Sequence, residues 1–151
     1  MIIAVALHVL AALIWVGGLF FILLILRPAS IRIEPPQRFR LFAKVFSRYF
    51  PWVWGAIALL LITGYWMLFS RLGGFAEAGL HIQVMQVLGI AMMLIFGHLY
   101  HTPYKRFRAA VEEENWAKTN YQANRIRRAI RWNLLLGLIV FIGATTGRYW
   151  A

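Results

Sequence analysis

Apolar residues are concentrated in four long stretches, and most of the polar residues lie between them. The stretches cover residues 2–26, 51–70, 81–100 and 129–150. An α-helix rises about 1.5 Å per residue, so runs of about 20 to 25 residues can cross a bilayer core of roughly 30 Å. The pattern predicts the all-α fold class, with an integral membrane four-helix transmembrane bundle forming a single domain over residues 1–151.

Prolines and charged segments predict where these helices begin and end. Pro28 is expected to stop the first helix, and Pro51 to open the second, because the missing N–H of proline costs least in a first turn. Pro103 is expected to interrupt the third helix. A helical approach to the second span is predicted from Leu41, and cytoplasmic helical extensions are predicted within the charged residues 104–128.

Composition supports a membrane protein and removes several classes of site. The chain is 62% hydrophobic and 14% charged, with a mean hydropathy of +0.67, which is too apolar for a soluble domain of this length. Cysteine does not occur in the sequence. Disulfides, thiolate metal sites and cysteine nucleophiles are therefore excluded.

The net charge of +11 is distributed in a way that predicts topology instead of nucleic-acid binding. Of the 16 basic residues, 14 fall between residues 27 and 48 or between residues 105 and 131. Four spans place both of these segments on one side of the membrane, and basic loops favour the cytoplasm. The predicted arrangement is N-out/C-out, and attraction to anionic lipid accounts for the charge without nucleic acid.

Histidine is the main candidate for chemistry within the spans, which lack Asp, Glu and Lys. His8 lies about 9 Å below the outer mouth of the first span, and His81 begins the third span near that mouth. Ala11 and Ala12 leave room for a flat group beside the His8 imidazole, and haem b held by two neutral imidazoles fits this arrangement. His8 is then the first axial ligand, His81 its expected partner, and Trp15 an aromatic neighbour of the ring.

Two alternatives to the His8 and His81 haem site follow from the histidines themselves. His8 can instead bond to a neighbouring helix, since a polar side chain in a span needs a partner. His98 and His101 lie one turn apart at the cytoplasmic end, about 26 Å from the depth of His81, so they form a separate candidate site. We expect His101 to be an ordinary interfacial residue, whereas His98 is the next haem ligand candidate.

The third span also predicts a copper site. His81, Met85 and Met92 lie at positions i, i+4 and i+11 on one helix face, and imidazole with thioether suits Cu(I). Methionine in an apolar helix is also a common packing residue. A second face, with Gln83 and Gln86, is expected to point into the bundle, where Asn133 of the fourth span could meet it.

Glycines in the fourth span predict close helix packing. Gly137, Gly143 and Gly147 should face neighbouring helices, because small residues let helix backbones approach in lipid.

Four segments of the chain resemble small CopD-like membrane proteins, the copper-resistance D group. They are ALHVLAALIWVGGLFFILLILRPA, LLLITGYWMLF, IFGHLYH and RIRRAIRWNLLLGLIVFIGATTGRYW. More distantly, the opening span resembles HemJ, a haem-containing protoporphyrinogen oxidase family that shares the histidine at His8. That family carries a lysine early in its third helix, where this chain has Gln83. The resemblance implies a bacterial inner-membrane (cytoplasmic membrane), multi-pass protein linked to copper or haem.

The main functional hypothesis is a haem b-binding membrane protein with a redox or electron-transfer role. If the protein is an enzyme, it is then a haem-dependent oxidoreductase. The alternative is copper binding from the periplasm, or copper transport, through His81, Met85 and His8. A third hypothesis is an accessory subunit without a ligand. Besides the lipid bilayer, the candidate partners are a quinone, a periplasmic redox or copper protein, and a second copy of the chain as a homo-oligomer.

Overall fold

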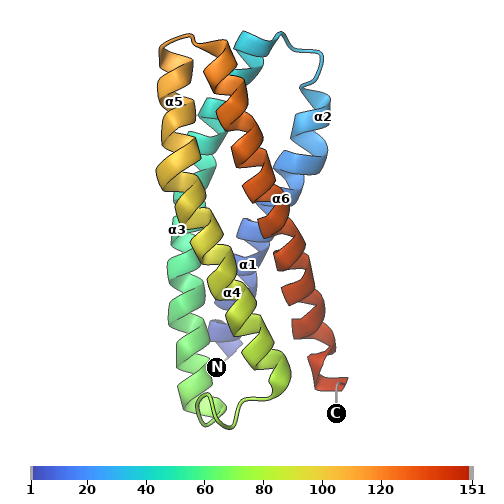
Figure 1. Ribbon diagram of the computed structural model, residues 1–151. Coiled ribbons are helices and arrows are strands. Elements are labelled where there is room, and N and C mark those ends of the chain that lie inside the picture. The colour runs from blue at the N-terminus through green and yellow to red at the C-terminus, as the bar shows by residue number, and fades with distance from the viewer. Residues whose placement is uncertain (1, 150–151) are drawn as a thin grey trace.

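A computed structural model describes residues 2–149, and all the regular structure in this part of the chain is helical. Four long helical rods run alternately up and down and form an elongated bundle (Figure 1). Each rod is long and apolar enough to cross a membrane. Large apolar side chains such as Leu94, which is 70% exposed, cover the outside of the bundle. The prediction of an all-α, four-span fold is confirmed.

The first rod extends slightly beyond its predicted end. It comprises α1 (Ile2–Phe20), a π-helical segment η1 (Phe21–Leu26) and α2 (Arg27–Ala29). Pro28 was expected to stop this helix, but Pro28 lies within its last turn. A proline lacks its N–H and its ring crowds the carbonyl four residues before it, and the wider π-helical turns directly before Pro28 accommodate both effects.

The second rod, α3 (Pro35–Arg71), begins 16 residues before the predicted start of the span at Pro51, and it includes the helical approach predicted from Leu41, which is confirmed. Pro51 lies inside this helix. Phe39, Phe46 and Phe50 recur at helical spacing along the added segment and are all buried. This aromatic face packs against the rest of the bundle, so the segment is stabilised as helix although its other face is charged.

The third rod passes through its predicted break. It consists of α4 (Leu80–Leu99), a π-helical segment η2 (Tyr100–Tyr104) and α5 (Lys105–Glu112). Pro103 lies inside the π-helical segment, so the interruption expected there is a local widening of a continuous helix. The helical extension predicted within residues 104–128 is confirmed.

The fourth rod, α6 (Trp116–Thr146), begins 13 residues before the predicted start at residue 129 and continues as a 3₁₀ turn, η3 (Gly147–Tyr149). The Asn115 side chain caps its first turn by accepting a hydrogen bond from the Lys118 N–H at 3.1 Å. The predicted end at Trp150 lies outside the described residues.

The rods pack mainly as two pairs, α1 with α3 and α4 with α6, and α1 also contacts α6. Near the end that carries the basic loops, α5 packs on α6 and contacts α3. Rings of Phe50, Trp54, Phe96 and Tyr100 make edge-to-face contacts between α3 and the third rod. Both ends of the described chain and the turn after α3 lie at one end of the bundle, and the two basic loops lie at the other (Figure 1).

The glycines of the fourth rod lie at helix contacts, as predicted. Gly137, Gly143 and Gly147 are all buried. A Cβ at Gly137 would lie 2.7 Å from Val16 Cγ2, and a Cβ at Gly147 would lie 2.4 Å from the His81 Cβ. Both distances are too short for a side chain, so these positions set how closely α6 approaches its neighbours.

Candidate functional site

His8 forms a side-chain hydrogen bond to the facing helix. Its Nδ1 lies 2.8 Å from the Thr63 Oγ1 on α3, and the Thr63 hydroxyl donates in turn to the Leu59 carbonyl at 2.6 Å. A hydroxyl has one proton, so Thr63 accepts from His8 and the proton of the neutral imidazole is on Nδ1. The Nε2 atom therefore keeps its lone pair, which is the state that binds a metal ion.

The space beside His8 is occupied by α3. A Cβ at Gly64 would lie 3.2 Å from the His8 Cε1, so the imidazole rests on the glycine backbone. Ala11, which was expected to leave room for a flat group, is 1% exposed and lines a cavity of about 370 Å³ together with residues of α3 such as Pro51 and Gly55. Two turns beyond His8 on α1, the Tyr49 hydroxyl donates to the Trp15 carbonyl. Next to the imidazole itself, α3 lies where a porphyrin was expected.

Trp15 is a core residue in this structure. It is 2% exposed and makes an edge-to-face contact with Phe96 of α4, with ring centroids 6.2 Å apart. Its Nε1 has no hydrogen-bond partner among the described residues, and the same holds for both amide atoms of the fully buried Asn133. Ordered water commonly satisfies such atoms in protein interiors.

His81 and Met85 lie on the other helix pair. His81 packs closely on Gly147 of η3 and near Gly79, and Met92 on the same helix face reaches within 3.2 Å of a Cβ at Gly137. This face of α4 therefore packs against the fourth rod. His8 contacts α3 and His81 contacts η3, so the two histidines lie near the same end of the bundle but on different helix pairs.

His98 lies in the last turn of α4 and His101 in η2, and both are exposed. The His101 ring lies 6.2 Å from the ring of Trp54 and 5.3 Å from that of Tyr100. Such aromatic surroundings fit an interfacial residue, as expected for His101. The structure keeps both histidines apart from His8.

Gln83 does not point into the bundle, so the expectation for its helix face was wrong. Its side chain is exposed and donates to the carbonyls of Phe75 and Ala78 in the turn between α3 and α4. Ile90 and His101, on the same face, are exposed as well. The Gln83 amide reaches these carbonyls because the end of the turn lies about one helical turn before Gln83.

The donor set of the site is small. Among residues 2–149, no group of three or more His, Asp or Glu side chains is arranged to hold a metal ion. Cu(I) accepts two or three soft ligands, including methionine sulfur, so it requires fewer residues than such a group. Sequence reasoning missed Thr63, whose hydroxyl orients His8. The sequence signal that could have identified Thr63 is its hydroxyl group within the apolar segment LLLITGYWMLF.

Comparison with known proteins matches residues 43–146 to the family model "Copper resistance protein D". The matched region contains Thr63, His81, Met85 and His98, whereas His8 precedes it. No curated protein matches, and no solved structure matches. This match does not test the resemblance to HemJ, which stays a prediction. The matched region covers more than half of the chain and all but the first of its four spans, so the chain belongs to the copper resistance protein D family and is a multi-pass membrane protein.

Proposed function

We propose that this protein binds Cu(I) at the end of the bundle where the chain begins and ends, and that it takes part in copper handling across the inner membrane. The observation that carries the proposal is the His8 hydrogen-bond chain. Thr63 holds the imidazole so that Nε2 is free to bind a metal in an otherwise apolar helix. Membership of the copper family makes copper the preferred cargo over haem b.

Two sets of donors are available to copper at this end. His8 is one, together with Met67, which lies one helical turn beyond Thr63 on the same helix. His81 and Met85 form the second set, one turn apart on α4. Imidazole and thioether groups bind Cu(I) in preference to hard divalent cations. No carboxylate lies within the helices around either set, so these sites have little affinity for calcium or magnesium.

Titration of the purified protein in detergent with Cu(I), in competition with a chromophoric chelator, tests the proposal. We expect stoichiometric Cu(I) binding by a protein without visible absorbance. A reducible Soret band in the purified protein, with no Cu(I) binding, would instead establish the haem b hypothesis. Absence of both signals would leave an accessory subunit without a ligand.

The N-out/C-out orientation is part of this proposal, because it exposes the His8 end to the periplasm. Its support is the concentration of basic residues at the opposite end. Alkaline phosphatase fused at the C-terminus should be active, and the same enzyme fused after Glu113 should be inactive. Green fluorescent protein fusions at the two points should give the reverse pattern. If only the alkaline phosphatase fused after Glu113 were active, His8 and His81 would lie on the cytoplasmic side.

A further inference from the structure

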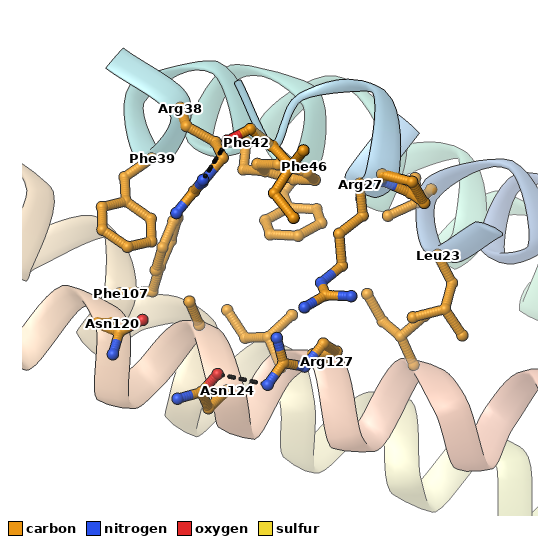
Figure 2. Close-up of a pocket in the computed structure, with 16 residues that line it drawn as sticks. Leu23, Arg27, Arg38, Phe39, Phe42, Phe46, Phe107, Asn120, Asn124 and Arg127 are labelled. Carbon is orange, nitrogen blue, oxygen red and sulfur yellow. Dashed lines mark hydrogen bonds between the residues drawn. The ribbon is translucent and has the colours of Figure 1, made fainter. Parts of the chain in front are cut away.

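The end of the bundle with the basic loops contains a cavity of about 260 Å³ that the copper proposal does not use. It lies between the first rod, α3 and α6, and Figure 2 shows the side chains that surround it. One part of its lining is cationic, two asparagines (Asn120 and Asn124) add amide groups, and the rest is mostly aromatic or aliphatic. Arg27, Arg38 and Arg127 supply the positive charge, each from a different rod.

The three arginines lack acidic partners. The ion pairs of the described residues are Arg40 with Glu114 and Lys118 with Glu113, and none of these four residues lines the cavity. Arg27 lies close enough to Arg127 for their like charges to repel each other, and Figure 2 shows the two guanidinium groups pointing toward one another. Like charges held together in this way are stabilised by an anion placed between them.

Most of the hydrogen-bond donors of these arginines remain available. Arg127 donates to the Asn124 Oδ1 at 2.7 Å, and Arg38 donates to the Ile31 carbonyl at 3.3 Å. A guanidinium has five N–H donors, and its planar fork matches two oxygens of a phosphate. The cationic part of the cavity therefore offers the donors that a phosphate group accepts.

Most of the remaining lining is apolar. Phe39, Phe46 and Phe107 are each 7% exposed or less, and Ile126 and Ile130 are buried as well. A phosphate ion alone would leave this wall uncovered, and a sugar phosphate would place polar groups against it, which costs free energy. A ligand that carries a phosphate on a hydrocarbon chain satisfies both parts of the lining.

We propose that this cavity binds an anionic phospholipid, with the phosphate on Arg27 and Arg127 and the start of an acyl chain along Ile22, Leu23 and Ile130, which line the cavity on the side toward the spans. The proposal is independent of copper binding, because three guanidinium groups repel Cu(I). A lipid is the preferred source of the phosphate because η1 and α2, at the end of the first candidate span, line the cavity, and anionic headgroups gather at basic membrane surfaces.

Native mass spectrometry of the full chain in detergent tests the proposal, with dioleoylphosphatidylglycerol as the probe. The Arg27→Gln/Arg127→Gln variant should retain the lipid about tenfold less than the wild type, as expected for the loss of one charge-assisted hydrogen bond or more. The matched control is Arg32→Gln/Arg128→Gln, which removes the same charge from exposed residues at the same end and should bind like the wild type. Equal losses in both variants would reduce the site to general surface charge and overturn the proposal.

Two further probes separate the sources of the binding. Dioleoylglycerol, which lacks the phosphate, should not be retained, and retention equal to that of the phospholipid would overturn the role of the arginines. Inorganic phosphate should not displace the lipid at equal concentration; displacement would overturn the lipid assignment in favour of free phosphate. Ala123→Leu reduces the volume of the cavity while leaving the arginines intact, so it should also lower lipid retention. Unchanged retention in Ala123→Leu would show that the lipid binds outside the cavity and would overturn the proposal.

Discussion

Gly137→Leu is expected to lower the melting temperature of the protein by roughly 2–12 °C. Gly137 lies where α6 meets both α1 and α4, and a Cβ there would be 2.7 Å from Val16 Cγ2 and 3.2 Å from the Met92 Cε. Val16 is β-branched and cannot rotate away freely, so the helices would have to separate. Overpacking costs about 1–3 kcal/mol in protein cores, and about 2–4 °C of melting temperature for each kcal/mol at this size. Size-exclusion yield and thermal unfolding in detergent measure the loss.

Gly55→Leu is the matched control. A Cβ at Gly55 would have no atom within 4 Å, and this residue also lies inside a helix. Both substitutions gain similar helix propensity, so the difference between their melting temperatures isolates the packing effect. Equal melting temperatures for the two variants would show that the α1, α4 and α6 contact does not determine stability.

His8→Ala is expected to cause the largest loss of Cu(I) affinity. Loss of an outer hydrogen-bond partner of a ligand typically lowers metal affinity by about 10- to 100-fold, and loss of the ligand itself should exceed that range. Competition with a Cu(I) chelator measures the affinity, and the melting temperature of the same sample shows whether the variant is folded. An unchanged affinity in folded His8→Ala protein would rule out His8 as a ligand.

Thr63→Val separates a metal site from a simple contact between helices. Valine keeps the shape of threonine but cannot accept the His8 proton, so Cu(I) affinity should fall by about 10- to 100-fold. His98→Ala is the control, because His98 is exposed and lies away from this site. If the His8 and Thr63 pair only holds the helices together, His8→Ala and Thr63→Val will both lower the melting temperature and leave the Cu(I) affinity unchanged.

The candidate site was only partly predictable. The sequence placed His8 as the only ionisable side chain in the first span, and it required a partner there because the span is apolar. Which partner it meets depends on how α1 packs against α3, and Thr63 lies 55 residues away. The expected pairing of His8 with His81 rested on shared depth, but depth does not decide which helices are neighbours. The tertiary structure puts these histidines on separate helix pairs.

The amino-acid sequence by itself determined the number and order of the spans and the end of the bundle that carries the basic loops. These follow from hydrophobic length and charge, which act locally along the chain. Tertiary structure decided the lengths of the helices and the form of the cavity. The sequence predicted helix from Leu41 and within residues 104–128, but the start of α3 at Pro35 and the continuous helix through Pro103 depend on the buried contacts of Phe39, Phe46 and Phe107. Contacts between distant segments are not encoded in any local pattern, so only the folded bundle could show them.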